Sequence, residues 1–143
     1  MTEMTLSDLA ERMAKIDICM LCSKTAGNRI GARPMSNNSD VEYDGTSYFF
    51  TLDDARMVAD IEKDPQVCLT FQGENWLSLA LEGKARVIQD KAAFRDHWVS
   101  DLDAWFKDGV DTEGLVLLEV TAERIAYWDG EDNGELVLDG SKG

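Results

Sequence analysis

The sequence predicts a mainly β protein of the α+β class, built on a six-stranded antiparallel sheet with flanking helices. Two observations favour this class. Six segments have the apolar or alternating pattern of β-strands, whereas only three have the periodicity of helices. Two of the strands are long, and one of them contains an internal glycine. Long strands interrupted by glycine are typical of sheets that bend and close into a barrel.

Three segments have apolar residues at helical spacing. The first, residues 5–15, begins at Thr5 or Ser7, either of which is a good N-cap. The second, residues 53–65, stops at Pro65 because proline cannot continue a helix. The third covers residues 91–106. The inward faces of the three are expected to carry Leu6, Leu9 and Met13, then Met57, Val58 and Ile61, then Phe94, Trp98, Leu102 and either Trp105 or Phe106.

The predicted strands are 16–23, 30–38, 47–51, 66–73, 76–90 and 114–129. Pro34 indicates an edge position or a bulge for the second strand, since proline donates no hydrogen bond to a ladder. Gly83 predicts a bend or bulge in the fifth. A polar loop is expected over 39–46, and the acidic, glycine-rich tail 130–143 is expected to be mobile. No internal repeat or second domain is apparent, so residues 1–143 are expected to form a single domain.

The charge balance narrows the classes of partner. The chain has 143 residues, with 14 Lys and Arg against 28 Asp and Glu, giving a net charge of -14. So acidic a surface repels nucleic acid and anionic membranes. No apolar run is long enough for a transmembrane helix, and the N-terminus lacks the pattern of a signal peptide. We therefore expect a cytoplasmic protein that binds neither nucleic acid nor membrane.

Cysteine, histidine and acidic residues give weak signals for catalysis or metal binding. Cys19 and Cys22 match C-x-x-C, but residues three apart on a strand face opposite sides, so core cysteines are the favoured interpretation. His97 is the only histidine, and a structural or surface role is favoured over a catalytic one. The acidic pairs Asp53 with Asp54 and Asp101 with Asp103 fit no calcium loop. No catalytic residue and no metal ligand is assigned.

The segment YFFTLDDARM, residues 48–57, indicates an anion site. It reads as the end of a strand that turns into a helix, and a helix N-terminus often holds a phosphate. Thr51 offers a hydroxyl and Arg56 a cation. Arg33 is a second cation, within an apolar strand, where it needs either a partner carboxylate or an anionic ligand. The residues alone leave these two alternatives open.

Several segments occur in one consistent order: RPM, YFFT, DPQV, LEGKARVIQD, DLDAWFKDGVD and AYWD. This ordered set resembles the flavin-binding split-barrel superfamily over about residues 5–129. It is most similar to the general stress protein branch of the pyridoxamine 5'-phosphate oxidase-like proteins. The resemblance implies a six-stranded antiparallel split β-barrel that forms a homodimer. It also implies FMN in a groove at the dimer interface, two per dimer.

The resemblance assigns roles to residues of the second and third strands. Arg33 matches the arginine beside the ribityl and phosphate groups of FMN. Pro34 and Met35 match the segment whose backbone runs along the isoalloxazine ring. Phe50 and Thr51 match the strand-end pair near the ring edge and the phosphate.

It also assigns roles further along the chain. Arg56 matches the arginine of an Arg-Lys phosphate clamp, but Met57 stands where the lysine is expected. We therefore expect weakened phosphate binding, which Met57→Lys should restore. Ser78 falls where the oxidases often carry a glutamine to the flavin. Trp128 matches the tryptophan that closes over the flavin.

The implied function is that of an FMN-binding protein of the general stress type. The segment GEDNGELVLDG, residues 130–140, has none of the basic residues that the true oxidases carry there, so pyridoxamine phosphate oxidation is not expected. A flavin-dependent oxidoreductase or flavin reductase with a small substrate is favoured. The alternatives are a non-catalytic flavin store or stress sensor, and a dimeric interaction module with a decayed flavin site. FAD or a deazaflavin could replace FMN.

Overall fold

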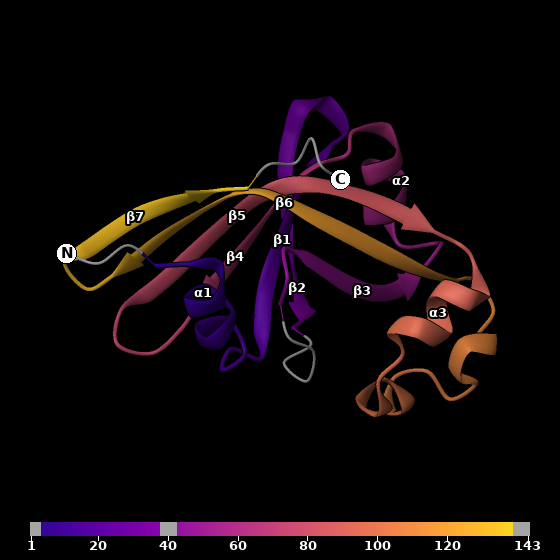
Figure 1. Cartoon of the computed structure of the whole chain (residues 1–143). Helices are drawn as coiled ribbons and strands as arrows, with labels where there is room; N and C mark the ends of the chain where they lie inside the picture. Colours follow the sequence, from indigo (N-terminus) through magenta and orange to yellow (C-terminus); the bar gives the residue numbers. More distant parts are fainter. Residues whose placement is uncertain (1–3, 38–42, 139–143) are drawn as a thin grey trace.

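The computed structural model describes residues 4–37 and 43–138. It consists of a mostly antiparallel sheet that curls into a half-barrel (Figure 1). Six strands follow the order β2-β1-β4-β5-β6-β3, and β7 pairs with β6. The predicted mainly β fold is confirmed. The strands are β1 Ile18–Thr25, β2 Arg29–Ser36, β3 Thr46–Leu52, β4 Gln66–Gln72, β5 Leu77–Ile88, β6 Leu115–Asp129 and β7 Asp132–Val137.

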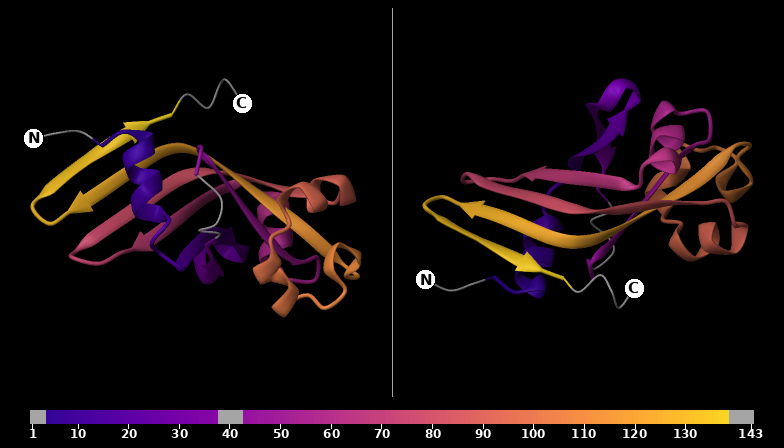
Figure 2. Two further views of the ribbon diagram at one scale, coloured as in Figure 1. Left: turned by 60° about the horizontal axis from the view of Figure 1, so that its bottom comes forward. Right: turned by 90° about the horizontal axis from the view of Figure 1, so that it is seen from above.

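In the described ranges, one α-helix precedes the first strand, and two further α-helices and three short 3₁₀ turns lie between strands. The helices are α1 Leu6–Met13, α2 Arg56–Lys63 and α3 Lys91–His97, and the turns are η1 Ala26–Asn28, η2 Ser100–Ala104 and η3 Gly109–Asp111. Thr5 is the N-cap of α1 and forms a capping box with Asp8. Figure 2 shows α1 lying across the sheet, whereas α3 lies at the opposite end of the molecule. None of the helices in the described ranges is long and apolar enough to cross a bilayer.

The core has two parts, which lie on opposite sides of the β3–β6 pair. Strand residues that alternate inward pack with Leu9 and Met13 of α1 and with Ile61 of α2 in the larger cluster. The smaller cluster joins Phe94 of α3 to Leu117 of β6 and to residues of β3. The first cluster therefore fills the half-barrel, and the second attaches α3 to its outer side.

The third helix is shorter than predicted. It ends at His97, because Trp98 and Val99 have extended backbones, with ψ of 134° and 154°. The Trp98 ring packs edge-on against two other rings, with centroid separations of 5.0 Å to Phe50 and 6.0 Å to Phe106. Helical spacing continues past His97 in the sequence, but this aromatic packing, which the sequence pattern does not contain, determines the backbone.

The tail is also more ordered than predicted. Residues 132–137 form β7, which pairs with β6 from Arg124 to Asp129. Arg124 donates to Glu135 at 2.7 Å, so cross-strand charge pairing supports a strand that is otherwise too acidic and glycine-rich to look like one. The remaining tail residues, 139–143, lie outside the described residues, as does the first half of the predicted loop over 39–46.

Gly83 marks a β-bulge, as predicted. The register of β5 against β6 shifts between Glu82 and Gly83, and a Cβ on Gly83 would overlap the Thr121 carbonyl oxygen. Only glycine allows the two backbones to approach so closely.

Gly83→Ala is expected to destabilise the protein by about 2–4 kcal/mol, because the β5–β6 backbones must separate to admit the methyl group. The free energy of unfolding in urea measures this loss. Gly27→Ala is the control: Gly27 has a φ of +75° but open space around its Cα, so about 1 kcal/mol of backbone strain is expected. Equal losses in the two variants would contradict the close approach.

The cysteines of C-x-x-C face opposite sides of β1, as predicted. Cys19 is buried and lies opposite Met35 of β2 and Phe71 of β4. Cys22 is half-buried on the other face and lies opposite Cys68. All three cysteines are free thiols. Within the described ranges no three His, Cys, Asp or Glu side chains are grouped to hold a metal ion.

Iodoacetamide at about pH 8 is expected to leave Cys19 of the native protein unmodified, whereas the half-buried Cys22 and Cys68 react wherever the outer face of the sheet is open to solvent. Burial raises the pKa of Cys19 to about 12, so roughly 10⁻⁴ of this thiol is ionised at that pH. Mass spectrometry of the digested protein identifies the labelled sites, and alkylation in urea provides the control in which all three react. Alkylation of Cys19 in the native protein would show that β1 is placed incorrectly.

Candidate functional site

The curled sheet brings its two edge strands, β2 and β3, to one hollow. Residues Met35 to Asn37 at the end of β2 and Tyr48 to Phe50 of β3 line a space of about 90 Å³. Trp105, which follows η2, lines it as well. The hollow therefore contains two residues assigned to the flavin by resemblance, Met35 and Phe50.

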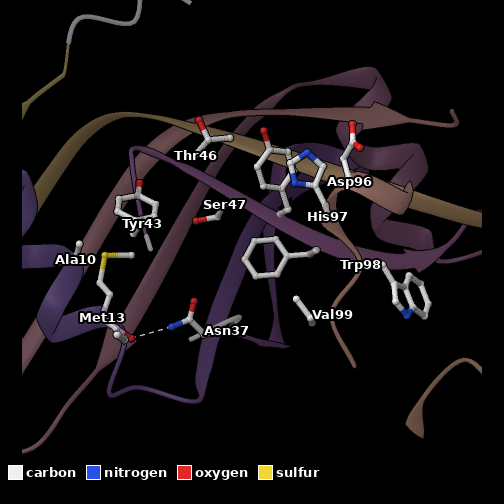
Figure 3. Close-up of a pocket in the computed structure, with 13 residues that line it drawn as sticks. Ala10, Met13, Asn37, Tyr43, Thr46, Ser47, Asp96, His97, Trp98 and Val99 are labelled. Carbon is white, nitrogen blue, oxygen red and sulfur yellow. Dashed lines mark hydrogen bonds between the residues drawn. The ribbon is translucent and has the colours of Figure 1, made fainter. Parts of the chain in front are cut away.

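A larger cavity of about 250 Å³ adjoins this hollow and shares Asn37, Tyr48 and His97 with it. Figure 3 shows Asn37, Tyr43 and Ser47 on one side of it and His97, Trp98 and Val99 on the other. The Asn37 side-chain amide donates to the carbonyls of Met13 and Ile16, at 2.9 and 2.8 Å. It thereby attaches the end of β2 to the end of α1.

Tyr48 and His97 form a stacked pair between the two spaces. Their ring centroids are 3.7 Å apart and their planes are inclined by 19°. The Tyr48 hydroxyl donates to Glu119 at 3.3 Å, and Glu119 also accepts from Arg86 at 3.2 Å. Burial, followed by the charge of Glu119, raises the pKa of Tyr48, which keeps its proton for this hydrogen bond.

The stack went unrecognised in the sequence, although the sequence carried part of the signal. Strand alternation places Tyr48 beside Phe50 on one face, and helical spacing places His97 between Phe94 and Trp98. The sequence pattern does not show that α3 packs on β3, since these elements are far apart in the chain. His97 therefore has a structural contact, in line with the interpretation favoured from the sequence.

The corner where β3 turns into α2 has the features of an anion site. Ala55 is the N-cap of α2, and no side chain caps the helix there. Arg56 begins the helix with its side chain 74% exposed, and its Nε lies 3.9 Å from Asp60. Thr51 is half-buried, opposite Val116. The Val58 N–H donates to the Ala55 carbonyl at 3.0 Å, so the N–H groups of Arg56 and Met57 are the ones that the missing cap leaves for an anion.

Arg33 lies on the edge strand β2, as Pro34 predicts. In the register it stands opposite Leu21, on the side that faces the core, yet its side chain is exposed. Within the described residues no carboxylate comes within 4.0 Å of its guanidinium. Of the two alternatives left open by the sequence, the partner carboxylate is thus not found there. Met35 points inward and is buried, whereas Pro34 faces outward, opposite Met20.

Met57 corrects an expectation. Its side chain is only 4% exposed and belongs to the main core with Ile61. A lysine there would have to bury its ammonium group or break the packing of α2. Met57→Lys is therefore expected to destabilise the fold, and the tighter FMN binding anticipated from the sequence does not follow. The clamp would rest on Arg56 and Arg33.

Ser78 and Trp128 lie directly opposite each other on β5 and β6. The Ser78 hydroxyl donates to Gln72 at 3.4 Å, and Trp128 is 47% exposed. In the sheet, β1 and β4 separate this pair from β2. One chain therefore divides the assigned residues into two groups. Arg33, Met35, Phe50, Thr51 and Arg56 lie along the β2 and β3 edges, and Ser78 and Trp128 lie on the outer face that also carries Pro34.

Solved structures of similar fold include a Clostridium acetobutylicum protein related to general stress protein 26. It shares 22% identity over 94% of both chains, with a TM-score of 0.82. The general stress FMN/FAD binding protein of Xanthomonas citri shares 24% identity over 93% of this chain and 94% of its own, with a TM-score of 0.72.

A haem binding protein of Mycobacterium smegmatis shares 15% identity over 96% of this chain and 60% of its own, with a TM-score of 0.74. These likenesses show the fold alone. No curated protein matches the sequence.

A family model described as pyridoxamine 5'-phosphate oxidase like matches residues 4–139, nearly the whole chain. This match agrees with the ordered motifs of the sequence and with the curled antiparallel sheet. The chain belongs to the pyridoxamine 5'-phosphate oxidase-like family.

Proposed function

We propose that this protein binds FMN as a homodimer and acts as a flavin-dependent oxidoreductase on a small substrate. The observation that carries the proposal is the corner of β3 and α2, where Thr51, Arg56 and an uncapped helix N-terminus converge. Arg33 adds an exposed cation with no carboxylate within 4.0 Å of its guanidinium among the described residues. An anion on a chain with a net charge of -14 needs such local cations, because the overall field repels it. The description of the Xanthomonas citri protein as FMN/FAD binding supports a flavin.

The donor set fits a flavin phosphate. Arginine holds phosphate through charge-assisted, bidentate hydrogen bonds, and backbone N–H groups at a helix start add to them. Arg33, Arg56 and Thr51 would hold the phosphate and ribityl end. Met35 and Phe50, which line the hollow, would face the ring. When bound, the flavin supplies the two-electron chemistry, and the protein supplies binding and orientation.

A second copy of the chain is needed to unite the two groups of assigned residues. The outer face of the sheet suits such a contact, because cores of interfaces are depleted in charged residues. Among the described strands, charged side chains are absent from its centre and lie at its margins, at Lys24, Glu82 and Arg124 and at Glu135, which pairs with Ala126 from the edge strand β7. We define the uncharged face as Ile18, Met20, Cys22, Ala32, Pro34, Cys68, Thr70, Ser78, Ala80, Ala126 and Trp128.

One observation favours a non-catalytic flavin store as second candidate. No lysine or arginine is among the described residues that line the two cavities. A substrate there would have to be neutral or cationic. Reoxidation of the reduced protein by a neutral quinone such as menadione tests the two functions. Turnover supports the oxidoreductase, whereas flavin that binds but never turns over with any acceptor supports the store.

Arg56→Ala is expected to weaken FMN binding by about tenfold to a hundredfold, because a charge-assisted hydrogen bond to the phosphate is lost. Riboflavin, which lacks the phosphate, should bind both proteins equally. Titration of flavin fluorescence measures the dissociation constants. Arg86→Ala is the matched control, because Arg86 is also exposed but pairs with Glu119. An equal loss of affinity for FMN and riboflavin would show that Arg56 does not contact the phosphate.

Ala80→Glu should dissociate the homodimer, because it places a carboxylate at the centre of the uncharged face, opposite Ala126. Sedimentation equilibrium measures the mass, which should fall from twice the 16.0 kDa of one chain to that of a single chain. Ala92→Glu, at an exposed position on α3 that is not part of this face, serves as control and should stay dimeric. A wild-type protein that is monomeric at every concentration would refute the interface.

A further inference from the structure

The turn between β4 and β5 places a tryptophan in an unfavourable backbone conformation. Asn75 and Trp76 both have positive φ, 57° and 67°. The Leu77 N–H donates to the Glu74 carbonyl at 3.2 Å, which closes a type I′ turn. Such a turn favours glycine at its second central position, where Trp76 stands. A bulky residue with this φ is an outlier that local backbone energetics disfavour.

Packing within the chain does not compensate for this strain. Trp76 is 84% exposed, more than any other large apolar side chain of the described residues. The groove beside the hairpin, between the end of α1 and the start of β1, is lined by Asn75 and Leu77 but not by Trp76. The fold therefore gains neither backbone stability nor core packing from a tryptophan at this position. Strain of this kind is typical of functional positions.

The location of Trp76 indicates what it contacts. It precedes Leu77 and Ser78, which pair with Asp129 and Trp128 of β6. The tips of the β4–β5 and β6–β7 hairpins lie side by side at one end of the molecule in both Figure 1 and Figure 2. Trp76 thus stands at the end of the uncharged face, beside the two residues that the proposed flavin site takes from this part of the chain.

We propose that Trp76 is an aromatic contact for the flavin ring, an inference that rests on the proposed function. An indole offers a large planar surface with few rotatable bonds, and the tight turn fixes the backbone that carries it. In the homodimer, the hairpin of one copy would reach the flavin whose phosphate the other copy holds at Arg33 and Arg56. Trp76 would then determine affinity for the tricyclic ring, common to FMN, FAD and riboflavin, and leave phosphate recognition to the arginines.

Trp76→Gly tests this inference in the full-length protein. The dissociation constants of FMN and riboflavin are expected to rise together, by about tenfold, because stacking on the ring is lost. The melting temperature without flavin should rise by about 2–5 °C, since glycine relieves the strained turn. Trp76→Phe, which keeps a ring, should retain most of the affinity. Asn75→Gly, in the same turn, should leave both dissociation constants unchanged.

Each outcome decides the matter. Unchanged flavin affinity in Trp76→Gly overturns the inference, while the proposed function stands. Failure of the wild-type protein to bind any flavin removes the proposed function itself, and this inference with it. A Trp76→Gly protein that sediments as a monomer also overturns the inference, because Trp76 would then anchor the second copy and affect flavin only indirectly.

Discussion

The close approach of β5 and β6 at Gly83 is the constraint on which the rest of the structure depends. On the N-terminal side of the bulge, the inward residues of β6 are Val120 and Ala122. On its C-terminal side they are Ile125 and Tyr127. The extra residue, Glu123, changes which side chains face inward and bends the longest strand pair. This bend lets one sheet curl until its edges, β2 and β3, line a common hollow. Without it, the residues of the candidate site would lie on opposite borders of an open sheet.

The sequence predicted those parts of the fold that depend on local pattern. Alternation located six strands. Gly83 predicted the bulge and Pro34 the edge strand, because the backbone geometry at these residues has few alternatives. The pattern could not show where α3 ends, since the aromatic contacts of Trp98 come from elements distant in the chain. The strand β7 was not predicted for a related reason. Its pairing depends on β6 and on the Arg124–Glu135 contact, and its own residues favour a loop.

The candidate site was predictable to a different degree. Residue types and order predicted that Arg33, Thr51 and Arg56 serve an anion. In the structure both arginines are exposed, and Arg56 lies 3.9 Å from Asp60. The expectation for Met57 was wrong because it rested on adjacency in the sequence. The first turn of α2 directs the Arg56 side chain to solvent and the Met57 side chain into the core. A motif that lists neighbours does not say which of them share a face. The division of the site into two groups likewise follows from sheet order, which no local pattern contains.

That division has a thermodynamic consequence for the proposed homodimer. Sites for small molecules usually enclose about 300–1,000 Å³, whereas the hollow and its adjoining cavity measure about 90 and 250 Å³. Neither space alone covers a flavin, and Ser78 and Trp128 lie too far around the sheet to help within one chain. If the second copy completes the site, flavin binds the dimer and not the separate chains. Ligand binding and association then reinforce each other, and each must raise the apparent affinity of the other by the same factor.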